Sequence, residues 1–99
     1  MKWIEMIHIR SNSDGAREQI RSAFYELEHT EKPKFLLCFQ LFQNLMVNDD
    51  LAVFLYWSSD VPRERTSTFG MNLASFFSEF GWINHVSWAL DRSTQNERG

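Results

Sequence analysis

The sequence predicts one small α+β domain with the element order strand–helix–strand–strand–helix–strand. Three observations predict it: short β-rich runs, two segments whose apolar residues recur every three to four positions, and turn or cap residues between them. The chain has 99 residues, of which 43% are hydrophobic, which is enough apolar bulk for a single core. The predicted domain spans residues 1–91, and residues 92–99 are expected to form a flexible polar tail.

The first half of the chain predicts a strand, a helix and a second strand. Residues 2–10 are β-rich and run into a cluster of turn and cap residues. A helix is expected to begin near Asp14, whose carboxylate can cap the first turn, and it cannot pass Pro33. Residues 34–47 are rich in aromatic residues and predict a strand rather than a buried helix. The apolar stripe of the helix consists of Ala16, Ile20, Ala23, Phe24 and Leu27.

The second half predicts the same sequence of elements again. A turn at residues 48–50 leads into a third strand over residues 51–57. Polar capping residues followed by Pro62 predict the start of a second helix, and Gly81 predicts its end before a fourth strand over residues 82–90. Two such halves pack most compactly as a ferredoxin-like fold, a four-stranded antiparallel sheet with both helices on one face. The stripe of the second helix consists of Phe69, Leu73, Phe76, Phe77 and Phe80.

The second and third predicted strands are apolar on both faces. Two helices can cover only one face of the sheet, and soluble monomers rarely expose a large apolar patch. A homodimer that packs through the open sheet face is therefore expected. In the third strand Leu51, Val53, Leu55 and Trp57 alternate with Ala52, Phe54 and Tyr56; in the second, Leu36, Cys38 and Phe42 alternate with Phe35, Leu37, Phe39 and Leu41.

Composition excludes several classes of function. Ten basic residues against 13 acidic ones give a net charge of −3, which disfavours binding to nucleic acid. The single cysteine, Cys38, cannot form an internal disulfide or a paired-cysteine metal site. Glu5 interrupts any signal-peptide core, and no apolar run approaches the ~20 residues of a membrane helix. The protein is therefore expected to be cytoplasmic, with no membrane partner.

Candidate catalytic residues are His8 and His85, on the first and fourth predicted strands. These strands are neighbours in the predicted topology, and an imidazole can act as a base near neutral pH. The alternative is that each histidine is hydrogen-bonded in the core or at the dimer interface. His29 is expected on the surface at the end of the first helix. No two histidines have the spacing of a zinc site, so neither a metal nor a cofactor is expected.

Candidate ligand-binding residues are polar or aromatic groups within the apolar strands. Aromatic cavities with a few polar groups are the usual form of small-ligand sites, so these residues could line a pocket for a small hydrophobic molecule. The amide side chains could equally pair across a dimer interface. Cys38 has no adjacent base and is expected to serve packing. The candidates are Gln40, Asn44, Trp57, Asn84 and Trp88.

In element order, length and two-sided strands, residues 2–91 resemble the dimeric α/β-barrel superfamily, which includes the antibiotic-biosynthesis-monooxygenase-like domains. The resemblance implies a homodimer whose sheets form a shared barrel, with a small-molecule cavity between sheet and helices. Some members oxidise aromatic polyketides or quinols without metal or flavin. Others cleave haem with an Asn on the first strand and a His on the second helix. Here the first strand offers His8 and residues 62–80 contain no histidine, so haem cleavage is not expected.

Three functions are therefore compatible with the sequence. The first is a monooxygenase-like enzyme that needs no cofactor and acts on an aromatic substrate, with His8 or His85 as the base. The second is a module of the same fold that binds a small ligand without turnover. The third is a dimeric interaction domain whose interior is filled by its own side chains. A cavity beside either histidine would separate the first two from the third.

Overall fold

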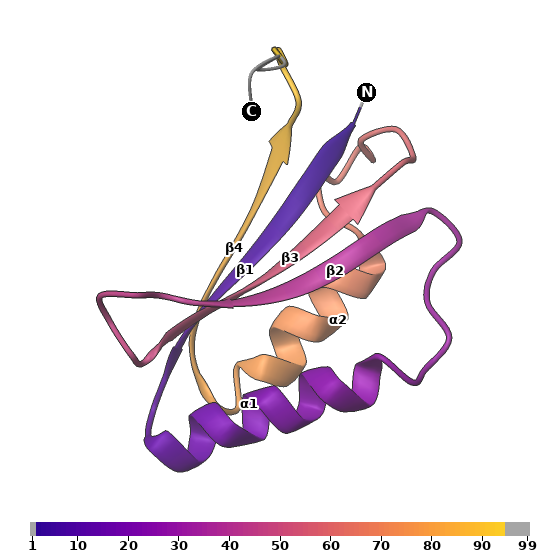
Figure 1. Ribbon diagram of the computed structural model, residues 1–99. Helices are drawn as coiled ribbons and strands as arrows, with labels where there is room; N and C mark the ends of the chain where they lie inside the picture. Colours follow the sequence, from indigo (N-terminus) through magenta and orange to yellow (C-terminus); the bar gives the residue numbers. More distant parts are fainter. Residues whose placement is uncertain (1, 95–99) are drawn as a thin grey trace.

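The computed structural model describes residues 2–94, and the six elements follow in the predicted order (Figure 1). Residues 92–94 have no regular secondary structure, and the rest of the expected tail lies outside the described residues. The elements are β1 (Trp3–Ser11), α1 (Asp14–Leu27), β2 (Leu36–Gln43), β3 (Asp50–Trp57), α2 (Thr68–Phe77) and β4 (Gly81–Ala89).

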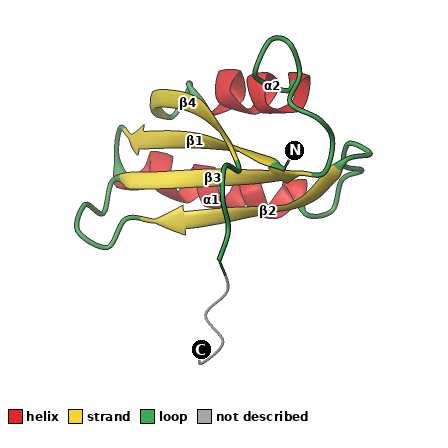
Figure 2. Cartoon of the chain, turned by 90° about the horizontal axis from the view of Figure 1, so that it is seen from above, coloured by secondary structure: helices red, strands yellow, loops and turns green. Residues whose placement is uncertain are grey.

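The four strands form one antiparallel sheet in the order β2-β3-β1-β4. Both helices lie on the same side of this sheet, and the strands lie side by side in front of them when the molecule is turned (Figures 1 and 2). The chain therefore has the ferredoxin-like α+β fold that its periodicity predicts. Neither helix in residues 2–94 has the length and apolar character needed to cross a membrane.

The core lies between the sheet and the helices. Burial alternates along the two central strands, β1 and β3, because successive side chains of a strand point to opposite faces. The helices contribute the buried residues of the two apolar stripes, although Phe76 of the second stripe remains 45% exposed. The buried cluster consists of Trp3, Ile7, Ile9, Ile20, Phe24, Leu51, Val53, Leu55, Trp57, Leu73 and Phe77.

The helix ends differ from the predicted ones. Ser13 rather than Asp14 caps α1: its Oγ accepts a hydrogen bond of 3.0 Å from the backbone N–H of Ala16. The prediction that α2 starts at Pro62 was wrong, because α2 begins at Thr68 behind the N-cap Ser67. Arg65 has a φ of 66°, a left-handed conformation that a helix through this segment cannot contain. The intervening residues form a loop over the edge of the core.

The second strand is shorter and more irregular than expected. It ends at Gln43, so residues 44–49 form the hairpin loop instead of continuing the strand. Leu36 pairs with Trp57 and Cys38 with Tyr56, which leaves Leu37 as an extra residue in a bulge. Leu36 therefore packs against the core and Leu37 is 62% exposed, which reverses the faces predicted for both. Cys38 is exposed rather than packed.

The face of the sheet opposite the helices is largely apolar. Residues that pair between neighbouring strands lie beside one another, so the side chains of this face form rows that run across the four strands. In the single chain two tryptophans of β4 are strongly exposed, Trp82 at 82% and Trp88 at 61%. The helices leave this face open, as expected from the two-sided strands. Its large apolar side chains are Ile4, Met6, Phe42, Phe54, Tyr56, Trp82, Val86 and Trp88.

Candidate functional site

The two candidate histidines lie on adjacent strands but on opposite faces of the sheet. His8 of β1 pairs with Asn84 of β4, whereas His85 pairs with Ile7. Consecutive residues of a strand point to opposite faces, so His8 shares the open face with Asn84, and His85 points toward the helices. The structure therefore places them in two separate environments.

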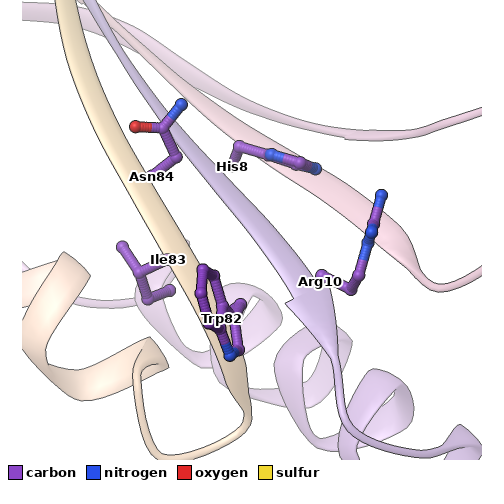
Figure 3. A pocket seen from close by; sticks show the side chains of 5 residues that line it. All are labelled: His8, Arg10, Trp82, Ile83 and Asn84. Atoms are coloured by element: carbon purple, nitrogen blue, oxygen red, sulfur yellow. The ribbon is translucent and has the colours of Figure 1, made fainter.

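On the open face, His8 belongs to an ion cluster at one end of the sheet. Its Nε2 lies 3.1 Å from Oδ2 of Asp50, and Arg10 donates from Nε to Oδ1 of the same carboxylate at 2.8 Å. The hydrogen bond from Arg10 holds the pKa of Asp50 below its ordinary value. Figure 3 shows His8 and Arg10 on β1 beside Asn84 and Trp82 on β4. Together with Ile83 these residues line a pocket of about 400 Å³. Because Asp50 of β3 already contacts both His8 and Arg10 of β1, this cluster is suited to holding the two strands together.

Two further candidates have roles visible in their contacts. The Oδ1 atom of Asn44 accepts hydrogen bonds from the backbone N–H groups of Met46 and Val47, at 2.8 and 3.0 Å. Asn44 therefore stabilises the β2–β3 loop. Gln40 lies on the open face opposite Phe54, in the middle of the apolar rows.

The two candidate tryptophans lie on different faces of the sheet. Trp57 is a core residue that stacks on Trp3, with ring centroids 5.7 Å apart and planes 15° from parallel. Trp88 pairs with Ile4 and is exposed on the open side of β4, an edge strand. The seven candidates thus fall into an open-face group, a loop residue and a helix-side group that contains only His85 and Trp57.

The helix-side group is organised by a residue that the candidate set did not include, Glu5. Its side chain is fully buried, with 0% exposure. One carboxylate oxygen, Oε1, accepts a hydrogen bond of 2.8 Å from the indole Nε1 of Trp57 and one from the hydroxyl of Ser67. The other, Oε2, accepts from the backbone N–H of Ser67 at 3.2 Å and contacts Nε2 of His85 at 2.7 Å. A buried carboxylate persists only with such hydrogen-bond partners.

Local sequence explains why Glu5 can occupy this position. In β1 it lies between Trp3 and Ile7, and its side chain points toward the helices as theirs do. Ser67 caps α2 directly above it, so the positive end of the helix dipole faces the carboxylate. Gly70 provides the space, because a Cβ atom there would lie 2.2 Å from Oε2 of Glu5. The signal for this site in the sequence was a charged residue, Glu5, at a strand position that alternates with the apolar residues Trp3 and Ile7.

His85 connects the buried carboxylate to a cavity. Its side chain is 14% exposed, and Nε2 contacts Oε2 of Glu5; since an ionised carboxylate can only accept hydrogen bonds, Nε2 is the nitrogen that donates to it. Within residues 2–94 no hydrogen bond engages the other ring nitrogen, Nδ1. A cavity of about 300 Å³ adjoins the ring, between β4, Trp3 and the loop that precedes α2. An imidazole held in this tautomer by a carboxylate can accept a proton at Nδ1.

Within the described part of the chain, no group of His, Cys, Asp and Glu side chains is placed to hold a metal ion. His29 lies on the surface, as expected, with its ring edge against Tyr25 at a centroid distance of 4.9 Å. The site is therefore built from a carboxylate, an imidazole and indole rings.

Comparison with solved structures supports the fold. The structure of Rv0793 from Mycobacterium tuberculosis superposes with a TM-score of 0.67 at 15% sequence identity, over 95% of this chain and 100% of that one. At this identity the likeness establishes the ferredoxin-like architecture and no more. No protein-family model matches the sequence, and no curated protein matches it either.

Proposed function

We propose that this protein binds a small aromatic molecule with an acidic O–H or C–H group in the cavity beside His85, and that His85 removes that proton. One observation carries the proposal: a buried carboxylate, Glu5, holds an imidazole whose second nitrogen has no partner within residues 2–94, at the wall of a cavity of about 300 Å³. Titratable groups held in a fixed geometry at the wall of a cavity are typical of active sites.

The division of roles follows from the contacts. Glu5 orients the ring of His85 and stabilises the imidazolium that forms when Nδ1 takes a proton. Trp57 and Ser67 hold the carboxylate in place through their hydrogen bonds. Trp3, Val61 and Ala89 are among the residues that line the cavity, and they give it an apolar wall for an aromatic ring.

The reaction we propose is an oxidation by O₂ without metal or flavin. Removal of a proton from an electron-rich aromatic such as anthrone gives an anion that can pass electrons directly to O₂. The CH₂ group then becomes a carbonyl with one oxygen atom of O₂, and the other oxygen atom leaves as water. This reaction would place the chain among the monooxygenase-like domains of the dimeric α/β-barrel superfamily.

We also propose that the protein works as a homodimer. The open face of the sheet carries exposed Trp82 and Trp88 together with an apolar centre, and a second copy of the same face would bury these residues. At the end of this face the charges of Arg10 and Asp50 neutralise each other, and His8 contacts the same carboxylate.

Oxygen uptake with anthrone tests the enzymatic proposal. The protein should accelerate uptake over buffer, and His85→Gln should lower the rate at least tenfold because Gln can still donate to Glu5 but cannot accept the proton. His8→Gln and the exposed control His29→Gln should leave the rate unchanged. Acceleration that survives His85→Gln would disprove the role of His85, and no acceleration over buffer would disprove the reaction.

A binding module without turnover is the second candidate. It is favoured by the size of the cavity, which at about 300 Å³ lies at the lower end of ligand sites. This function predicts that 1-naphthol quenches tryptophan fluorescence saturably while anthrone causes no oxygen uptake above buffer.

A further inference from the structure

The loop that borders the cavity beside His85 contains a residue in a strained backbone conformation, Arg65. With a φ of 66°, it is the one residue other than glycine in the left-handed region among those that the structure describes. A Cβ atom makes this conformation unfavourable, and residues held in it cluster at functional sites. The backbone N–H of Arg65 donates to the carbonyl of Pro62 at 3.0 Å and so closes the turn. The side chain of Arg65 therefore extends from a fixed point at the wall of the cavity.

The guanidinium of Arg65 has no partner within residues 2–94. The arginine ion pairs of this part of the chain engage Arg10, Arg17 and Arg21 instead. The side chain of Arg65 is exposed, so its long apolar stem can turn and its N–H groups are accessible to a ligand. Its five donors remain free to bind an acceptor at the cavity.

The lining of the cavity makes Arg65 its positive end. Apart from His85, the other lining residues carry no ionisable side chain, and no acidic residue is among those that the structure places there. The acidic neighbour in the chain, Glu64, lines a separate pocket on the side of Pro33 and Phe35. A bound anion would therefore meet a cation in this cavity without a competing carboxylate on its lining.

We propose that Arg65 binds a carboxylate of the ligand, so that the ligand is an aromatic acid with its acidic O–H or C–H group at His85. This inference rests on the function proposed above and narrows its substrate class. A guanidinium presents paired N–H donors that match the two oxygens of a carboxylate. A single cation also balances the one charge of a carboxylate, whereas a phosphate monoester carries about two.

The exposure of Arg65 decides how such a ligand lies. Since the side chain is exposed, the carboxylate binds where the cavity opens to solvent and keeps part of its hydration. The aromatic ring enters the apolar part of the cavity, toward the buried Trp3 and the ring of His85. Transfer of a charge out of water is costly, so this orientation buries the ring without burying the charge.

A matched pair of ligands tests the carboxylate site. 4-Hydroxyphenylacetate and 4-hydroxyphenylacetamide have nearly the same shape, and at about pH 7 the first is an anion while both phenols are protonated. In calorimetry we expect the acid to bind about fivefold more tightly, the effect of one exposed ion pair. Arg65→Gln should abolish this preference and leave the affinity for the amide unchanged. Arg63→Gln is the matched control, because it removes the same charge from an exposed residue of the same loop that does not line the cavity; it should keep the preference.

Arg65→Gly separates a binding role from a structural one. Glycine adopts the left-handed conformation without steric strain, so this variant should melt at a higher temperature than the native protein and still lose the preference for the acid. A lower melting temperature would show that the arginine side chain stabilises the fold, and it would overturn the assignment.

The binding results also separate this inference from the function on which it rests. Equal binding of the acid and the amide, both weakened by His85→Gln, would overturn the carboxylate site and leave the proposed function standing. A preference for the acid that Arg65→Gln removes, with affinities unaffected by His85→Gln, would support the carboxylate site and refute the role of His85. Absence of binding by either compound would overturn both proposals.

Discussion

Replacing Gly70 by alanine should destabilise the protein by disturbing Glu5. The new Cβ would lie 2.2 Å from Oε2 and 2.8 Å from Cδ of the Glu5 carboxylate, far inside van der Waals contact. The carboxylate cannot step aside freely, because four hydrogen bonds from Trp57, Ser67 and His85 hold it. Relief of the overlap must therefore break or stretch some of these bonds.

The size of the effect follows from the bonds at risk. Hydrogen bonds to a charged group contribute roughly 1.5–3 kcal/mol each, so the loss of one or two costs about 2–5 kcal/mol. The replacement of glycine by alanine within a helix by itself stabilises the folded protein by about 1 kcal/mol. We therefore expect Gly70→Ala to lower the free energy of unfolding by about 1–4 kcal/mol.

Urea denaturation followed by circular dichroism measures this change. Gly15→Ala in α1 is the matched control, because a Cβ there would have its nearest contact at 3.8 Å, to Oγ of Ser13. It should gain up to about 1 kcal/mol. If Gly70→Ala were as stable as Gly15→Ala, the close packing of α2 on the Glu5 carboxylate would be refuted.

Two other predictions concern the open face of the sheet. Since Arg10 lowers the pKa of Asp50 in the folded protein, Asp50 should contribute stability above its unfolded pKa of about 4 and lose it as the pH falls through the lower folded value. In urea denaturation the excess stability of the native protein over Asp50→Asn should thus be present at pH 7 and shrink below about pH 4; a constant difference would contradict the ion pair. Light scattering at micromolar concentration should give twice the chain mass, and Phe54→Glu, at the centre of the open face, should give the monomer. Tyr25→Glu on α1 should remain dimeric, and a monomeric native protein would refute the dimer.

The fold was predictable because its elements carry strong local signals. The apolar stripe containing Ile20 and Phe24 has helical period, and the inward residues of β3 alternate as a strand should. The start of α2 was not predictable from Pro62, because Pro and polar residues are equally typical of a loop. Only the left-handed backbone at Arg65 and the cap at Ser67 decide between the two.

The candidate site was predictable only in part. His85 was identified by its chemistry and Trp57 by its position in an apolar strand, and the structure brings both to Glu5. Glu5 was missed as a site residue because its role depends on its contacts with Ser67 and His85. Both residues are distant from it in sequence and approach it only when the strands pair and α2 packs on the sheet. The spacing of residues along one strand cannot reveal contacts between residues so far apart in the chain.

The sequence by itself determined the element order, the apolar stripes of the two helices and the two-sided apolar strands, because hydrophobic periodicity and composition are properties of local segments of the chain. The tertiary structure decided which histidine meets which carboxylate. His8 and His85 differ by a single position in the β1–β4 register, and that position sends one to Asp50 on the open face and the other to Glu5 beneath α2. A shift of one residue in a sheet exchanges its faces, so only the paired strands could assign the two roles.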